Sequence, residues 1–233
     1  MLHAKKIGWT PRCGSRLIVF RKIRGMTAGY RRHSIARSMS PTTFTSPIWI
    51  TTGDWMCWWR ATRGVSWLRR DNSNHWQRLL LGVGNQERPN SNRGASEVRV
   101  GRWKNGRQFL ATIEPWHGHQ VVVYMPHSKP EEVPWQRQIV DEELRWGHAV
   151  WCADLDGDGN DEVIVGVRDR LNDRFGPGVR VYRSLDESGR KWQREIIENG
   201  GVATEDLAVG DLDGDGRPDI VAVGRFTGNV RIY

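Results

Sequence analysis

Residues 154–162 read Asp-Leu-Asp-Gly-Asp-Gly-Asn-Asp-Glu, and residues 211–219 read Asp-Leu-Asp-Gly-Asp-Gly-Arg-Pro-Asp. Each acidic stretch leads directly into a short run of β-branched and small residues, which is typical of a strand. Carboxylates at positions 1, 3, 5 and 9 of a loop tightened by two glycines can surround a hard divalent cation. Since these like charges repel one another unless a cation neutralises them, we predict that both loops bind calcium.

The predicted calcium ligands occupy the same positions in both loops. They are the side chains of Asp154, Asp156, Asp158 and Glu162 with the backbone carbonyl of Asn160, and the side chains of Asp211, Asp213, Asp215 and Asp219 with the backbone carbonyl of Arg217. An EF-hand is excluded because it needs Glu at position 12, where this chain has Val165 and Ala222. We therefore expect calcium to hold hairpins in shape rather than to take part in a reaction.

The sequence around the loops is periodic. Trp-Gln-Arg begins at residues 76, 135 and 192, at intervals of 59 and 57 residues. Each unit contains four short strand-like runs within about 55 residues and shows no helical periodicity. These features predict an all-β fold, a partial β-propeller of about four four-stranded antiparallel blades that carry the calcium loops. A two-sheet sandwich is the alternative, but that fold does not require sequence motifs that recur at the same position in every unit.

From about residue 65 to residue 233, the two acidic loops and the strands that follow them resemble the FG-GAP or VCBS repeats of integrin-alpha-like propellers. The resemblance implies calcium in the loop between the first two strands of a blade. It also implies a secreted or periplasmic protein, although no signal peptide is visible in this chain. The equivalent loop at residues 101–106, Gly-Arg-Trp-Lys-Asn-Gly, lacks carboxylates and is predicted not to bind calcium.

We divide the chain into a poorly specified N-terminal region, residues 1–62, and propeller blades, residues 63–233. Residues 48–59 match no strand or loop of the repeat. In the neighbouring reading frame, the codons of this stretch permit Asp-Leu-Asp-Asn-Asp-Gly-Arg-Leu-Asp-Val-Leu-Val, which would be a further calcium loop. We therefore hypothesise that roughly residues 41–62 are an out-of-frame translation and that the chain is a fragment of a larger ring.

The net charge of +8 is unevenly distributed. Residues 1–75 contain 14 Lys and Arg against two Asp, whereas residues 76–233 contain 21 Lys and Arg against 25 acidic residues. Because the basic excess lies largely in the region whose reading frame is in question, we expect no nucleic-acid partner. No apolar run approaches the roughly 18 residues that a membrane span needs, so we expect no membrane span either.

A second group of polar residues falls on connections at the other end of the predicted blades. His117 and His119 belong to a connection between a second and a third strand, and His148 and Glu205 each lie six residues before the first Asp of a calcium loop. These four residues could line the propeller axis, bind a second divalent metal, or act as acid and base on a ligand. The alternative is a structural role, with His148 at a strand end and the other two His packed beside Trp116.

Residues 113–120, 147–154 and 224–230 also resemble the propeller domain of aldos-2-ulose dehydratase/isomerase-type proteins. This resemblance implies metal-assisted dehydration of a keto-sugar, which is the reaction of a carbon–oxygen lyase. We predict a calcium-binding recognition scaffold of extracellular type for an unknown protein or carbohydrate ligand. The alternative function is a sugar lyase that uses the His/Glu end of the propeller.

Overall fold

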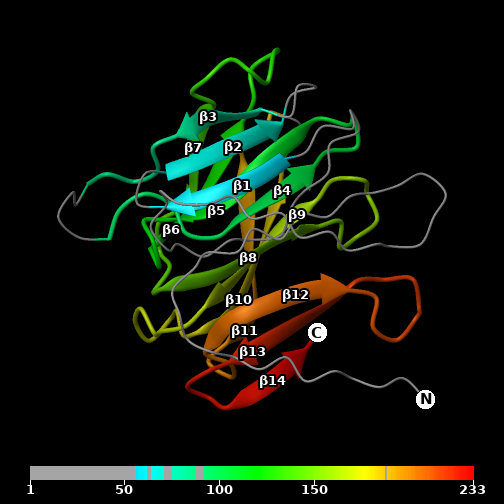
Figure 1. The fold of residues 1–233 in the computed structure, drawn as a ribbon. Helices are drawn as coiled ribbons and strands as arrows, with labels where there is room; N and C mark the ends of the chain where they lie inside the picture. The colour runs from blue at the N-terminus through cyan, green and yellow to red at the C-terminus, as the bar shows by residue number, and fades with distance from the viewer. Residues whose placement is uncertain (1–55, 62–63, 71–74, 88–91, 187) are drawn as a thin grey trace, which may run out of the picture. The chain divides into compact units, whose positions relative to one another are not determined.

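The computed structural model describes residues 56–61, 64–70, 75–87, 92–186 and 188–233. These residues form fourteen β-strands and no helix, and consequently no helix in this part of the chain could cross a membrane. The strands lie in four antiparallel sheets (Figure 1). Within each sheet the strands follow one another in sequence order, so each sheet is a meander.

Two of the sheets have four strands, and the described residues give the other two sheets three strands each. The four-stranded sheets are β4 (Val98–Arg102), β5 (Gln108–Glu114), β6 (Gln120–Met125) and β7 (Gln136–Asp141), and β8 (Gly147–Ala153), β9 (Glu162–Val167), β10 (Gly178–Ser184) and β11 (Trp192–Asn199). The three-stranded sheets are β1 (Met56–Ala61), β2 (Gly64–Arg70) and β3 (Trp76–Gly82), and β12 (Thr204–Gly210), β13 (Asp219–Gly224) and β14 (Asn229–Ile232).

The sequence period coincides with the sheet boundaries. The three Trp-Gln-Arg sequences mark the start of β3, β7 and β11, and each of these is the last strand of its sheet. The acidic loops connect the first two strands in two sheets, β8 to β9 and β12 to β13. The predicted placement of the loops within the repeat is therefore confirmed.

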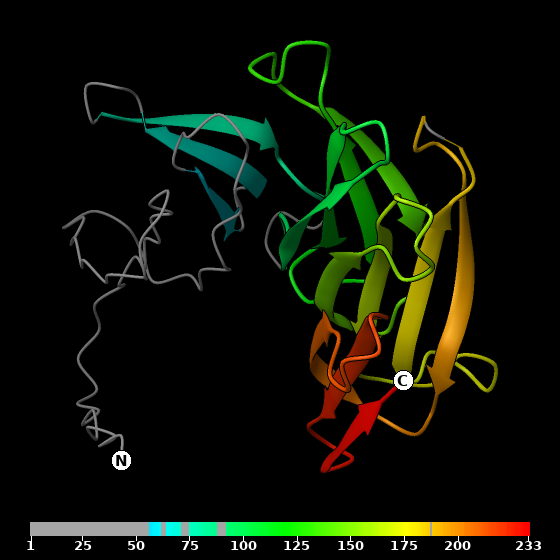
Figure 2. The same cartoon turned by 90° about the vertical axis from the view of Figure 1, so that its right-hand side faces the viewer.

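Apolar side chains hold consecutive sheets together. The first strand of each sheet lies against the first strand of the next, since β4 contacts β8 and β8 contacts β12 (Figure 2). Three buried clusters join the four sheets in succession, and each combines residues from two neighbouring sheets. Burial of β-branched and aromatic side chains between sheets is the main favourable term for such a fold. This arrangement of meanders fits a partial β-propeller.

The described part of the N-terminal region is a strand. Residues 56–59, from the stretch whose sequence matches no strand or loop of the repeat, belong to β1, which pairs antiparallel with β2. By order within its sheet, β1 corresponds to the second strand of a blade, because β3 is the Trp-Gln-Arg strand that elsewhere is fourth. Residues 41–55 and 62, which complete the segment assigned to a shifted reading frame, lie outside the described residues.

Candidate functional site

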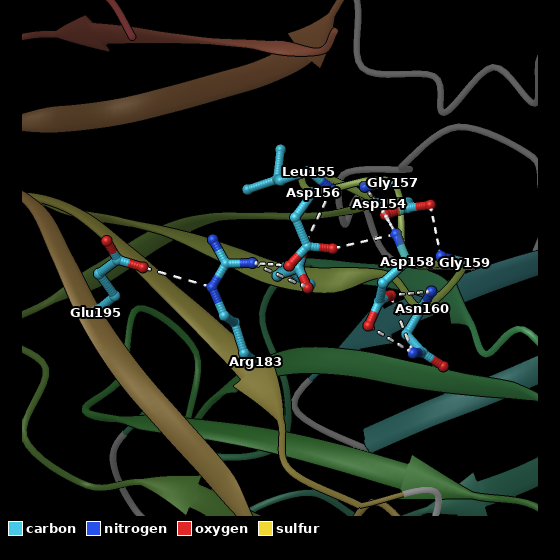
Figure 3. Close-up of polar contacts among 10 residues, drawn as sticks. Asp154, Leu155, Asp156, Gly157, Asp158, Gly159, Asn160, Arg183 and Glu195 are labelled. Carbon is cyan, nitrogen blue, oxygen red and sulfur yellow. Dashed lines mark hydrogen bonds and ion pairs between the residues drawn. The ribbon is translucent and has the colours of Figure 1, made fainter.

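The first acidic loop, residues 154–161, is shaped by hydrogen bonds to its own carboxylates (Figure 3). The backbone N–H groups of Gly157 and Gly159 donate to the two carboxylate oxygens of Asp154, at 2.8 and 2.9 Å. Both glycines have positive φ angles, 77° and 88°, a region that side chains disfavour. The Gly residues between the carboxylates therefore allow the loop to close around Asp154.

The second acidic loop, residues 211–218, repeats this geometry. Gly214 and Gly216 donate to the two oxygens of Asp211 at 2.7 and 3.0 Å, and both again have positive φ. The last acidic residue of each motif, Glu162 or Asp219, accepts a hydrogen bond at 2.8 Å from the backbone N–H of the second. The two loops thus share the hydrogen bonds that orient their first and last carboxylates.

Carboxylate oxygens converge in both loops. Ligand atoms of Asp154, Asp156 and Glu162 lie within 4.8 Å of one another in the first loop, and so do those of Asp211, Asp213 and Asp215 in the second. An all-carboxylate oxygen set at this spacing fits a hard cation such as calcium. Among the described residues no third group of three acidic, His or Cys side chains converges in this way.

Asp158 lies outside the converging sets, and two members of those sets, Asp215 and Glu162, have environments of their own. Asp158 accepts hydrogen bonds from the backbone and side-chain N–H groups of Asn160, and these bonds lower the pKa of its carboxyl. Asp215 is paired with the guanidinium of Arg217 at 2.7 Å, which likewise lowers its pKa. Burial raises the pKa of Glu162 to about 7. A cation placed among these oxygens would favour the ionised form of Glu162.

The first loop is also attached to the preceding sheet. Arg102 donates its backbone N–H to Asp161 Oδ2 at 2.9 Å, and the backbone N–H of Asp161 donates to the Arg102 carbonyl at 2.7 Å. Lys104 donates its backbone N–H to Asn160 Oδ1 at 3.2 Å. The connection at residues 101–106, which lacks carboxylates, therefore serves as a docking surface for the neighbouring acidic loop.

At the opposite end of the blades, two β-bulges position the predicted His/Glu residues. The register of β8 with β9 shifts between Gly147 and Ala149, and the register of β12 with β13 shifts between Thr204 and Asp206. The unpaired residues at these shifts are His148 and Glu205. A bulge re-aims the side chain of its extra residue. His148 and Glu205 are thus equivalent in backbone geometry, and not only in their equal sequence distance from the acidic loops.

Three of the four predicted residues meet there. The rings of His117 and His148 are 4.2 Å apart between centroids and 30° from parallel, and His148 Nδ1 is 3.8 Å from Glu205 Oε2. The His148 side chain is only 5% exposed, and its burial, together with the nearby His117, lowers its pKa to about 4. His148 is therefore neutral near pH 7. None of the convergent ligand groups in the described part of the chain includes a His.

His119 instead belongs to a cleft of about 660 Å³ that His117 also lines. The ring of His119 is 6.4 Å from that of Trp146 in an edge-on arrangement, and Trp116 on the same cleft is 42% exposed. Arg145, Arg168, Glu87 and Glu142 complete its charged lining. The cleft thus offers two indole rings, two imidazoles and charges of both signs, which suits a polar ligand with an apolar face.

Sequence reasoning missed the polar network behind this cleft. Glu114 is fully buried and accepts two hydrogen bonds from Arg137, at 2.7 and 2.9 Å, and one from the Tyr124 hydroxyl at 2.7 Å. Gln120 links Arg137 to Asn85, which lines the cleft, through two bonds of 2.9 Å. An available signal was Glu114 itself, a carboxylate at the end of a largely apolar strand.

Comparison with known proteins bears on both ends of the blades. Residues 154–222, which contain both acidic loops, match the family model of the FG-GAP-like repeat. The chain is also similar to aldos-2-ulose dehydratase of Phanerodontia chrysosporium, with 31% identity over 158 residues. That match covers 60% of this chain and 17% of the relative, so the chain spans less than a fifth of that protein's length. Both resemblances seen in the sequence are confirmed: residues 154–222 carry FG-GAP-like repeat sequence, and the chain is similar to part of an aldos-2-ulose dehydratase.

Proposed function

We propose that this chain is a calcium-binding propeller-type scaffold that recognises a ligand at its His/Glu end. The observation that carries the proposal is the pair of acidic loops, which present three convergent carboxylates each at equivalent places in successive sheets. The FG-GAP-like repeat match over the same residues supports it. We further propose a secreted or periplasmic setting, where millimolar calcium suits modules with Kd values of roughly 10⁻⁴ to 10⁻³ M.

Calcium in the first loop would be held by Asp154, Asp156 and Glu162, and in the second by Asp211, Asp213 and Asp215. The ion supplies positive charge that offsets the repulsion among these carboxylates. The orientation of the carboxylates comes from the chain itself. Gly157, Gly159 and their counterparts in the second loop fix it by donating backbone hydrogen bonds. The expected result is a more stable hairpin rather than a chemical step.

Thermal unfolding tests this proposal directly. The melting temperature of the full chain should rise when calcium replaces a chelator, and magnesium should have a much smaller effect because it requires a tighter octahedral site. The double change Asp156→Ala and Asp213→Ala should abolish the calcium-dependent rise. Asp173→Ala, which removes an exposed carboxylate outside both loops, is the control and should keep it. An equal melting temperature with calcium and with chelator would contradict calcium binding.

The ligand-binding part of the proposal rests on the 660 Å³ cleft. Exposed indole rings beside polar groups commonly stack on the apolar faces of sugars or contact protein side chains. Binding to an array of oligosaccharides and secreted proteins should be weakened by Trp146→Ala and kept by Leu185→Ala, an exposed apolar residue on the connection between β10 and β11. Loss of binding in both variants, or in neither, would argue against this cleft.

A second candidate function, a sugar lyase, is favoured by the similarity to aldos-2-ulose dehydratase. Dehydration needs one group to take a proton from carbon and another to protonate the leaving hydroxyl. His117 and His119 are the imidazoles on the cleft, whereas His148 is buried behind His117 and would act only on that ring. We propose that this activity uses a second divalent metal at the His/Glu end.

Two measurements separate the lyase from the scaffold. The lyase should release water from an aldos-2-ulose, and His119→Gln should abolish this without lowering the melting temperature. Metal analysis after dialysis against calcium alone should find a retained transition metal. A chain that binds calcium but shows neither turnover nor retained metal is a scaffold.

A further inference from the structure

An arginine from another strand lies against the first acidic loop. Arg183 is on β10, and its Nη1 is 2.5 Å from Asp156 Oδ2 (Figure 3). The same Nη1 is 3.4 Å from Glu162 Oε1. These are two of the three residues whose carboxylate oxygens converge in this loop. The loop therefore already contains a positive charge supplied by the protein itself.

The same guanidinium has a second carboxylate within reach. Arg183 Nε is 3.5 Å from Glu195 Oε2 on β11, on the side away from the acidic loop (Figure 3). Arg183 is one-third exposed, and Glu195 is about half exposed. A long side chain at the surface can shift between two such partners at small energetic cost, because each exposed ion pair contributes only about 0.2 to 1 kcal/mol.

The second loop has no comparable arrangement. Its ion pair with Asp215 comes from Arg217, which belongs to the loop itself and is 84% exposed. Among the described residues, no Lys, Arg or His from outside residues 211–219 forms an ion pair with this loop. Arg217 also pairs with a single carboxylate of its loop, whereas Arg183 pairs with two carboxylates of the first loop and with Glu195 on β11.

We propose that Arg183 is a built-in competitor of calcium at the first loop. Without calcium its guanidinium offsets part of the negative charge of Asp156 and Glu162 and keeps the loop in shape. Calcium displaces it toward Glu195, so part of the binding free energy is lost in breaking the two existing contacts. The first loop consequently binds calcium more weakly than the second. This inference rests on the proposed calcium-binding function.

Calcium titration by calorimetry tests the inference one loop at a time. In full-length chain carrying Asp213→Ala, only the first loop remains intact. Adding Arg183→Gln should then tighten calcium binding about tenfold, the factor expected from removing one positive charge roughly 6 Å from a divalent ion in a water-like dielectric. Adding Glu195→Gln instead should weaken binding about threefold, because the displaced guanidinium loses its alternative partner.

Arg190→Gln is the matched control, since it removes an exposed arginine from the connection between β10 and β11 and should leave the affinity unchanged. If the first loop binds calcium equally well with and without Arg183→Gln, or if Glu195→Gln fails to weaken it, the inference is overturned while the proposed function stands. If the unmodified chain binds no calcium at either loop, the proposed function itself is wrong. Because Glu195→Gln keeps Arg183 in place, the inference remains testable even if Arg183→Gln unfolds the chain.

Discussion

The two acidic loops share one motif but differ in what surrounds them. Residues 154–162 are attached to the preceding sheet through Asp161, contain the buried Glu162 and receive Arg183 from β10. Residues 211–219 have Pro218 where the first loop has Asp161, and proline has no N–H to donate to a neighbouring sheet. The same ligand pattern thus lies within a network of protein contacts in the first loop and on an exposed hairpin in the second. We infer that the first loop depends less on calcium than the second.

The largest expected difference is in calcium-dependent stability. Asp213→Ala should remove most of the stabilisation by calcium, about 2.7 kcal/mol for a site exposed to free calcium at one hundred times its Kd. Asp156→Ala should remove less, because Arg183 and the Asp161 contacts support the first loop without an ion. Chemical unfolding at fixed calcium and with chelator measures both. Equal losses of stability in the two variants would show that the two loops do not differ in their dependence on calcium.

The pH must be controlled in that comparison, because His148 at the other end of the blades titrates in a relevant range. Burial lowers its pKa to about 4, whereas in the unfolded chain it binds a proton below about pH 6.5. At this residue the unfolded state therefore binds more protons between these values, so the contribution of His148 to stability falls as the pH drops from 6.5 to 4, whereas Glu162, with its raised pKa, contributes with the opposite sign. His148 alone should lower stability by about 1.6 kcal/mol between pH 6.5 and pH 5, measured in chelator as the difference between the unmodified chain and His148→Gln.

His148→Gln should reduce that decrease while leaving calcium affinity unchanged. His75→Gln, which replaces an exposed His just before β3, is the control and should preserve the pH dependence. A pH profile that His148→Gln does not alter would show that its neutral form is not favoured by folding.

The smallest expected effect concerns the attachment of the first loop. Asp161→Ala removes the carboxylate that accepts the Arg102 N–H and should cost about 1 kcal/mol of stability in chelator, since the site is partly open to water. Pro218→Ala at the same position of the second loop should change stability by less than about 0.5 kcal/mol. A comparison of denaturation midpoints is sufficient. Equal effects would mean that the contact with the preceding sheet contributes nothing.

Local sequence was enough to predict the features that repeat. The acidic loops, their positions between the first two strands and the boundaries marked by Trp-Gln-Arg all follow from residue types at short spacing. Each loop closes through hydrogen bonds among its own residues, such as those from Gly157 and Gly159 to Asp154, so a nine-residue window contains the necessary information. The equivalence of His148 and Glu205 was also visible as an equal distance from the loops.

Features that depend on packing between strands could not be predicted in this way. Arg183 lies 27 residues from Asp156 in sequence and reaches it only because β10 pairs with β9. The bulges at His148 and Glu205 are register shifts, and no residue type marks them. His119 shares a motif with His117 but lies beside Trp146 instead of His148. The turn after β5, in which His117 has a positive φ, directs the two side chains to different neighbours: the His117 ring lies beside His148 and the His119 ring beside Trp146.

The shifted-frame hypothesis remains a prediction about a third acidic loop. Its residues lie mostly outside the described part of the chain, but β1 begins where the neighbouring frame would encode the strand after that loop. The DNA sequence decides the matter. Codons at Thr51 to Gly53 that are compatible with Asn-Asp-Gly in the neighbouring frame would support it, and incompatible codons would exclude it.

The number of calcium ions bound per chain tests the central claim most directly. Native mass spectrometry after chelator treatment and calcium titration should find two ions in the unmodified chain and one after Asp213→Ala, with the remaining ion bound more weakly than the one lost. A chain that takes up no calcium, or that still binds two ions after Asp213→Ala, would contradict the account.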